Sequence, residues 1–292
     1  LSPKILSLLG GLEESRVEDV LAELEESRRF IRKEGDRYVF RNENLRKIIV
    51  KAARPGWAKK LTKKLAEIVF LEWDDPPWGT VDHLASLLER WGETDQAAEV
   101  LLESAERQKS RGDYGGAAQK YQRAAEITDY FEGMDEKEQV RRLLEAGEAG
   151  LSNLSFEFSE RVVKSAIDLS RRMSWERQRA ESSLLLAKVY TRSGRVNEAI
   201  DLARDAAPVA EKTGDDLLMA KVYASIAESY QQWGKYGPDA EFVSRAVRIA
   251  GDYGDVVKLG EYLQLAVMHA MGVGDYDKTW DYLERARPIA EA

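Results

Sequence analysis

The sequence predicts a mainly α-helical protein, in which a right-handed superhelical α-solenoid of paired helices follows a small amino-terminal domain. Three observations support this prediction. A glycine-containing phrase recurs about every 40 residues, apolar residues recur at helical spacing on both sides of each copy, and two short β-prone runs lie near the amino terminus. The chain of 292 residues is long enough for both parts.

Two short helices are expected first. Residues 3–9 have helical character, and residues 15–18 read Ser-Arg-Val-Glu, a capping box that predicts a helix start at Ser15. The apolar face of this second helix is formed by Val17, Val20, Leu21 and Leu24.

A β-hairpin and a third helix complete the amino-terminal domain. The phrase RFIRKEGDRYVF, residues 29–40, places two β-prone runs around Glu-Gly-Asp, and a helix follows from about Asn44 to Ala53. The order helix, helix, hairpin and helix is that of a partial winged-helix domain, which we assign to residues 1–54.

A helical arm or linker is expected over residues 55–94. It contains a long helix over 57–72, a proline-bounded linker, WDDPPWGT, over 73–80, and one more helix from His83. Asp74 and Asp75 in the linker form a possible metal pair, but a solvated cap is the more economical interpretation.

The segment GDYGGAAQKYQRAAEI, residues 112–127, has two possible interpretations: a phosphate-binding loop that opens a helix, or a turn between helices. Related phrases begin at Asn153, Gly194, Gly234 and Gly274, so the five turns are 41, 41, 40 and 40 residues apart. A catalytic loop has no reason to return at fixed intervals, whereas a turn in a repeat does. We therefore expect a helix to end at each glycine.

Residues 95–292 are accordingly predicted to form five antiparallel helix pairs of about 40 residues each. Ala187, Ala199, Ala227 and Ala246 would let neighbouring helices approach closely. Pro238 fits the first turn of its helix, whereas Pro208 and Pro288 are expected to kink or end theirs. The expected pairs cover residues 95–128, 135–173, 176–212, 216–253 and 256–291.

Composition argues against most kinds of catalytic site. The chain has no cysteine and only two histidines, and it lacks Walker-type, His-Glu-x-x-His and Gly-x-Ser-x-Gly motifs. No apolar run is long enough to span a bilayer, and no signal peptide opens the chain. We expect a cytoplasmic, non-enzymatic piece of a longer protein, with no cofactor, metal or membrane partner. His269 is expected to be a packed histidine rather than part of a pocket.

Charge is distributed unevenly. The net charge is −8, yet residues 28–64 carry fourteen basic against three acidic residues, a local charge of +11. Such a segment can bind nucleic acid, or it can pack on the acidic remainder of the same chain. The candidate nucleic-acid residues at the end of the second helix and in the wing are Arg28, Arg29, Arg32, Lys33 and Arg37.

The repeats resemble the tetratricopeptide repeat, in which alanine, glycine-x-tyrosine and further alanines recur. This pattern is carried by Ala105, Gly112, Tyr114, Ala117, Tyr121 and Ala124, and again by Ala187, Tyr190, Gly194, Ala199 and Ala206. The period of about 40 exceeds the usual 34, the second unit lacks the glycine, and Thr279 replaces an alanine. The resemblance implies a TPR-like solenoid with longer helices.

The order of parts is similar to that in signal-transduction ATPases with numerous domains (STAND ATPases), including regulators of the maltose-activator type. Tyr38-Val39-Phe40-Arg41 and Arg46 match their joining stretch, although Asn42 replaces a histidine. The resemblance implies a regulatory fragment with an upstream nucleotide-binding domain in the parent chain. It further implies a sensor that binds a protein, peptide or small inducer and controls autoinhibition.

In such a sensor the inner surface is lined by the first helix of each pair. The candidate ligand-binding residues at these inward positions are Glu181, Lys188, Arg192, Lys221, Glu228, Gln231, Gln232, Gln264 and Met268. Two alternatives remain: a constitutive protein-interaction scaffold, and DNA binding through the basic winged helix.

Overall fold

The computed structural model describes residues 2–35, 37–52, 55–72, 79–129, 131 and 133–291. Within these residues the chain forms fifteen helices and one two-stranded sheet. It divides into two compact units, residues 1–104 and residues 105–292. None of the helices in the described part is long and apolar enough to cross a membrane.

The first unit contains short helices and a β-hairpin. Strands β1 and β2 pair antiparallel with Ile31 opposite Phe40 and Glu34 opposite Arg37, so the predicted hairpin is confirmed. The elements are α1 (Pro3–Gly10), α2 (Glu14–Glu26), β1 (Ile31–Glu34), β2 (Arg37–Phe40), α3 (Glu43–Ala52), α4 (Pro55–Glu72) and α5 (Thr80–Arg90), followed by the start of α6 (Thr94–Ser110).

The predicted capping box at Ser15 is wrong. Helix α2 begins at Glu14, and its N-cap is Glu13, whose side chain makes no capping hydrogen bond. Gly11, with φ 64°, ends α1, and the chain is helical again from Glu14, one residue before the predicted start. The predicted apolar face does exist, since Val17 and Leu21 are buried with Ile31 in one cluster, although Val20 is 40% exposed.

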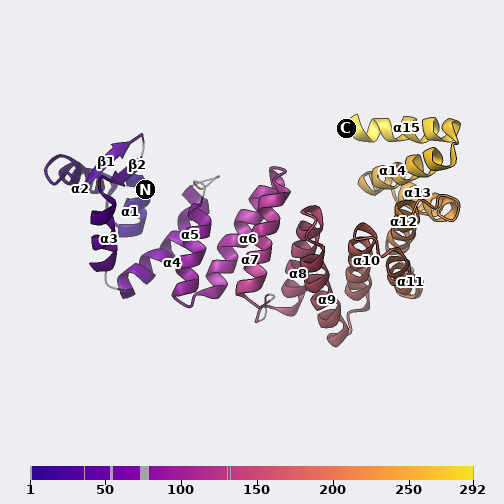
Figure 1. The fold of residues 1–292 in the computed structure, drawn as a ribbon, viewed down its shortest axis with the longest axis horizontal. Helices are drawn as coiled ribbons and strands as arrows, with labels where there is room; N and C mark the ends of the chain where they lie inside the picture. Colours follow the sequence, from indigo (N-terminus) through magenta and orange to yellow (C-terminus); the bar gives the residue numbers. More distant parts are fainter. Residues whose placement is uncertain are drawn as a thin grey trace. The chain divides into compact units, whose positions relative to one another are not determined.

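The second unit is a series of antiparallel helices that follow one another in chain order (Figure 1). Their bounds agree with the expected helix ranges to within a few residues. After α6 these helices are α7 (Tyr114–Ile127), α8 (Glu136–Ser152), α9 (Phe156–Arg172), α10 (Glu176–Arg192), α11 (Val196–Thr213), α12 (Asp216–Gln232), α13 (Ala240–Tyr253), α14 (Val256–Val273) and α15 (Tyr276–Glu291).

A residue in the left-handed conformation marks the turn inside each pair. Gly112, Gly194, Gly234 and Gly274 have φ between 71° and 85°, as the sequence predicts for glycines at helix ends. In the second pair α8 ends at Ser152, so the turn predicted to begin at Asn153 is confirmed, and its left-handed residue is the next one. Asn153 is the C-cap of α8 at φ −94°, and Leu154 adopts the left-handed conformation at φ 58°.

The predicted effects of the prolines on their helices were less accurate. Pro208 and Pro288 do not end their helices, because α11 continues to Thr213 and α15 to Glu291. In α11 the residues that follow the proline, Val209 and Ala210, are buried, so packing holds the last turn despite the missing N–H donor. Pro238 precedes α13 instead of lying in its first turn.

Small residues permit close helix packing in the second unit. The four alanines predicted for this role, Ala187, Ala199, Ala227 and Ala246, are completely buried. Gly147 on α8 is packed still closer, since a Cβ atom there would lie 2.5 Å from Cγ2 of Val163 on α9. The close spacing of these helices therefore requires residues no larger than alanine or glycine at the contact positions.

Leu154→Gly is expected to stabilise the protein by about 0.5 to 1 kcal/mol. A left-handed leucine costs roughly 1–2 kcal/mol, part of which is offset because glycine gives the unfolded chain more freedom. The leucine side chain is 61% exposed, so little packing is lost. The urea midpoint measures the gain. Leu154→Ala, which keeps the Cβ clash, is the control, and an equal gain in both variants would contradict the explanation.

Candidate functional site

A groove of about 580 Å³ runs along the second unit and is lined by the first helices of four successive pairs, α8, α10, α12 and α14. In Figure 1, α10, α12 and α14 lie on the inner side of the curve that this unit describes, with α11 and α13 outside. The groove is therefore on the surface where the sequence predicts a ligand.

Six of the nine predicted ligand-binding residues line this groove: Glu181 and Lys188 on α10, Lys221 and Glu228 on α12, and Gln264 and Met268 on α14. The other three do not line it. Arg192 and Gln232 are the exposed last residues of α10 and α12, whereas Gln231 binds the buried Asp239. The ligand-binding role of all nine stays a prediction.

The groove residues form rows that follow the 40-residue period. One row, which we call row one, is Glu181, Lys221 and Glu261; a second, row two, is Glu148, Lys188, Glu228 and Met268. The sequence-based selection missed Glu148 and Glu261, together with Lys258 and Tyr262. A shift of 40 residues from Lys188 and Lys221 would have found the first two, because helix pairs of equal period present the same face at equivalent positions.

The two rows differ in how their charges are paired. In row one, Nζ of Lys221 lies 3.2 Å from Oε1 of Glu181 and connects α12 to α10, and Glu261 pairs with Lys258 at 2.7 Å. In row two, the side chains of Glu148, Lys188 and Glu228 form no ion pair or hydrogen bond with any residue that the structure describes. Row two therefore carries the free charges of the groove.

An apolar floor lies between the charges. Leu184 and Tyr262 are at least nine-tenths buried, and Leu144, Leu185 and Leu265 complete the floor. Burial raises the pKa of the Tyr262 phenol, which stays neutral at physiological pH. Charged walls and an apolar floor together suit a ligand that presents both kinds of side chain, as a peptide does.

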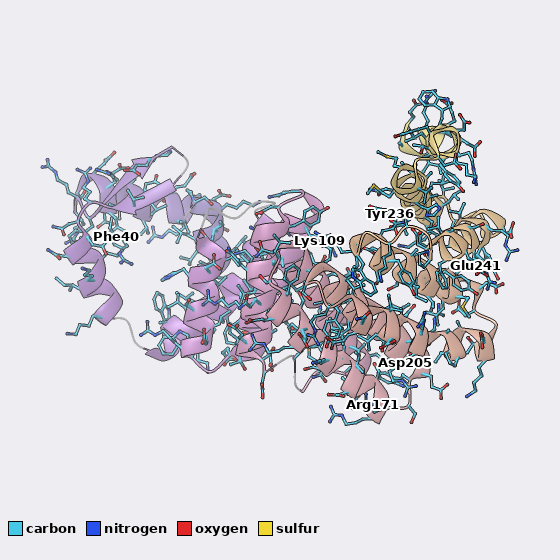
Figure 2. All side chains as sticks on the ribbon, turned by 45° about the vertical axis from the view of Figure 1, so that its right-hand side comes forward. Phe40, Lys109, Arg171, Asp205, Tyr236 and Glu241 are labelled. Atoms are coloured by element: carbon cyan, nitrogen blue, oxygen red, sulfur yellow. The ribbon has the colours of Figure 1, made fainter. Side chains whose placement is uncertain are left out.

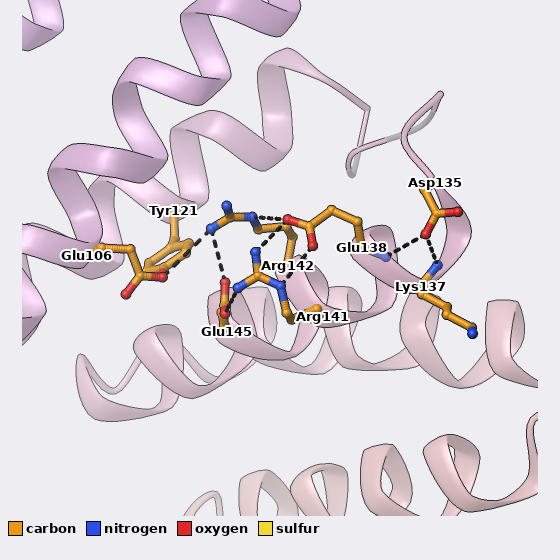
Figure 3. Close-up of polar contacts among 8 residues, drawn as sticks. All are labelled: Glu106, Tyr121, Asp135, Lys137, Glu138, Arg141, Arg142 and Glu145. Atoms are coloured by element: carbon orange, nitrogen blue, oxygen red, sulfur yellow. Dashed lines mark hydrogen bonds and ion pairs between the residues drawn. The ribbon is translucent and has the colours of Figure 1, made fainter.

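The charges on the earlier turns of α8 are already neutralised (Figure 3). Arg142, only 20% exposed, lies 2.8 Å from Glu138, 3.3 Å from Glu145 and 3.7 Å from Glu106. The hydroxyl of Tyr121 donates to Glu106 at 2.5 Å, and burial followed by this hydrogen bond raises the pKa of Tyr121. This network connects α6, α7 and α8 and is structural.

A second buried polar group holds the turn between α12 and α13. The carboxylate of Asp239 is completely buried, accepts a hydrogen bond from Nε2 of Gln231 at 2.8 Å and lies 2.7 Å from Nδ1 of His269. Tyr236 of the same turn, labelled in Figure 2, lies so close to α14 that a Cβ atom at Gly272 would overlap its ring. His269 is therefore a packed histidine that anchors a turn.

A third polar cluster connects α9 and α10 to Arg195, the N-cap residue of α11. The carboxylate of Glu160 on α9 accepts hydrogen bonds from Lys164 at 2.6 Å, from the Tyr190 hydroxyl of α10 at 2.9 Å and from Arg195 at 2.9 Å. Partial burial raises the pKa of Glu160, but these three donors together outweigh it and hold that pKa at about 2.

In the first unit two of the five basic candidates form ion pairs with acidic neighbours. Arg28 lies 3.9 Å from Glu23, and Arg32 lies 2.5 Å from Glu34. The ammonium group of Lys33 lies 5.9 Å from the centre of the Tyr38 ring. Arg29 has a left-handed backbone, and the side chain of Arg37 is outside the described part of the chain.

Lysines beyond the hairpin also pair within this unit, since Lys59 and Lys63 both bind Glu93, at 2.6 and 2.9 Å. DNA binding by the basic segment stays a prediction. Asp74 and Asp75 lie outside the described residues, among which no three potential metal ligands cluster.

Comparisons with known proteins identify the fold. No protein-family model and no curated protein sequence matches this chain. Among solved structures, a Rap protein complexed with the Competence and Sporulation Factor is 16% identical with a TM-score of 0.58, covering 99% of this chain and 74% of that one. Aspartyl phosphate phosphatase F from Bacillus subtilis is 14% identical with a TM-score of 0.52, covering 94% and 72%.

A STAND protein with a tetratricopeptide repeat sensor from Pyrococcus horikoshii is also similar. It is 12% identical with a TM-score of 0.52, and the match covers all of this chain and 54% of that protein. At these identities the comparisons establish the fold alone. The predicted TPR-like α-solenoid is thereby confirmed, whereas the winged-helix assignment of residues 1–54 and the hand of the superhelix stay predictions.

Glu160→Gln is expected to destabilise the protein by about 1 to 2 kcal/mol at pH 7, because the depressed pKa of Glu160 reflects interactions that only the carboxylate makes in full. A depressed pKa contributes stability above the unfolded value of 4.5, and this contribution is lost as pH falls towards 2. The difference in urea midpoint between the variant and the unmodified protein should therefore narrow below about pH 4.5. A difference that is independent of pH would contradict this assignment.

Asp239→Ala is expected to destabilise the protein by about 2–3 kcal/mol, since Gln231 and His269 would lose a buried charged acceptor. Thermal and urea unfolding measure the loss. Asp205→Ala is the matched control, because Asp205 is exposed on α11 and has no polar partner among the described residues. Similar effects of the two substitutions would mean that the Asp239 cluster is not structural.

Proposed function

We propose that this chain is a non-catalytic regulatory fragment of a signalling ATPase, in which the groove of the second unit binds a protein or peptide ligand. One observation carries the proposal. Three successive first helices, α8, α10 and α12, align unpaired charges beside an apolar floor, and these charges include Lys188 and Glu228. Charges without structural partners at a concave surface are available to a ligand at no structural cost.

The dimensions favour an extended peptide over a compact small molecule. Neighbouring packed helices are about 8–10 Å apart, so four of them span roughly 25–30 Å. An extended segment of about eight or nine residues covers that length. The similarity to a Rap protein complexed with the Competence and Sporulation Factor supports a regulatory ligand of this kind, and a small inducer is the alternative.

The regulatory mechanism follows from the proposed order of parts. We assign residues 1–54 to a partial winged helix, residues 55–94 to a helical arm and residues 95–292 to the sensor, with a nucleotide-binding module upstream in the parent chain. The similarity to the STAND protein over the whole length of this chain supports this order. A ligand that binds the open form better than the autoinhibited form shifts the equilibrium towards the open form.

Peptides selected by phage display against this protein are expected to bind the groove. The double variant Lys188→Ala, Glu228→Ala should weaken their binding at least about tenfold, since both free charges of adjacent helices are removed. Fluorescence anisotropy measures affinity, and a bound peptide should raise the unfolding temperature. Asp205→Ala on the outer helix α11 is the control. Selected peptides that bind the double variant unchanged would contradict a groove site.

A further inference from the structure

We propose that the groove recognises an extended peptide in which charged side chains alternate in sign at every third residue. Basic, acidic and basic side chains would face Glu148, Lys188 and Glu228 in turn, and an apolar side chain three residues further would face Met268. This inference rests on the proposed function and adds the chemistry of the ligand to it.

The sign alternation is a property of row two. Its members lie on α8, α10, α12 and α14 at positions exactly 40 residues apart, and consecutive helices in this series contact one another. The charges run negative, positive, negative, and the last position is Met268, which is 46% exposed. A ligand crossing the four helices therefore meets one binding position on each helix.

The pairing pattern selects row two over row one as the recognition surface. Row one is already neutralised by the Lys221–Glu181 and Lys258–Glu261 ion pairs. A charged ligand side chain at row one would have to displace one of these ion pairs. A charged ligand side chain at row two would meet an unpaired group. The free energy of recognition is consequently concentrated at row two.

The spacing of the helices determines the spacing within the peptide. A β-strand presents side chains to one face every two residues, about 6.6 Å apart, or every four, about 13 Å apart, and neither matches a helix spacing of about 8–10 Å. A polyproline II segment has three residues per turn and rises about 3.1 Å per residue, so every third side chain points the same way, about 9.3 Å from the last. Of these two extended conformations only polyproline II matches the helix spacing, and the proposed ligand adopts it.

The apolar end of the groove sets the fourth position. Met268, Leu265 and the buried Tyr262 of α14 lie together at the groove, where row two has no charge. An aliphatic side chain buried there would favour a fixed register, since a shift by one helix would place it opposite Glu228. The predicted ligand pattern is basic-x-x-acidic-x-x-basic-x-x-aliphatic, in either chain direction.

The test uses synthetic fluorescein-labelled peptides in which proline fills every x position. The matched peptide carries arginine, glutamate, arginine and leucine, and the reversed peptide carries glutamate, arginine, glutamate and leucine. Each is made in both chain directions. Fluorescence anisotropy at low salt is expected to show that the matched peptide binds at least about tenfold more tightly than the reversed one, because like charges repel at three positions in the latter.

A charge-exchanged protein provides the complementary measurement. The triple variant Glu148→Lys, Lys188→Glu, Glu228→Lys should prefer the reversed peptide, and Asp205→Lys on the outer helix should leave the original preference unchanged. The three exchanged residues are exposed or half-buried, and circular dichroism verifies that the variant folds. The comparison of matched and reversed peptides on the unmodified protein stands without the variant.

The outcomes separate this inference from the proposed function. Equal binding of the matched and reversed peptides, or no binding of either, overturns the alternating pattern. If peptides from phage display still bind and lose affinity on the variant Lys188→Ala, Glu228→Ala, the groove remains a peptide site with other rules. If displayed peptides also fail to bind, the proposed function falls with it.

Discussion

The architecture depends on one constraint: a helix pair of this kind cannot bury its apolar stripe alone and needs the next pair to cover it. In α11 the residues on this stripe, from Val196 to Ala210, are buried, and α12 packs directly against that helix. Because each pair must meet the next in the same way, residues 40 apart face the same direction. The rows of the groove are a consequence of that requirement and follow from packing, before any ligand is considered.

The period is maintained even where the local sequence departs from it. The turn between α12 and α13 contains seven residues where the turn between α10 and α11 contains three, yet α13 has 14 residues where α11 has 18. The longer turn is compensated by a shorter helix, so the left-handed glycine inside the next pair, Gly274, still follows Gly234 by 40 residues. The additional residues are not loose, because Asp239 and Tyr236 attach the turn to α14. The 40-residue spacing of the turns is thus kept although the lengths of individual turns and helices vary.

The sequence alone predicts the features that depend only on the 40-residue repeat and on the spacing of apolar residues. Helix ranges, glycine turns and six groove residues follow from apolar spacing and a repeat of 40, since these fix which face of a helix points inward. The sequence was insufficient where a residue's partner is distant. Gln231 shares the inward face by spacing, yet a buried carboxylate on the following turn draws its amide away from the groove. The start of α2 at Glu14 and the continuation of α11 through Pro208 also depend on neighbours that no local pattern contains.

The distinction between structural and available charges is likewise three-dimensional. Lys188 and Lys221 look equivalent in the sequence, as inward lysines of successive repeats, yet only Lys221 meets a carboxylate of the adjacent helix. An exposed ion pair contributes little to stability and is partly screened by salt, so the Lys221–Glu181 pair mainly removes two charges from recognition. What remains at the groove is a sparse set of unpaired charges, one on each of α8, α10 and α12. A solenoid can in this way derive specificity from a uniform repeat, because ion pairs between neighbouring helices determine which charges are left for a ligand.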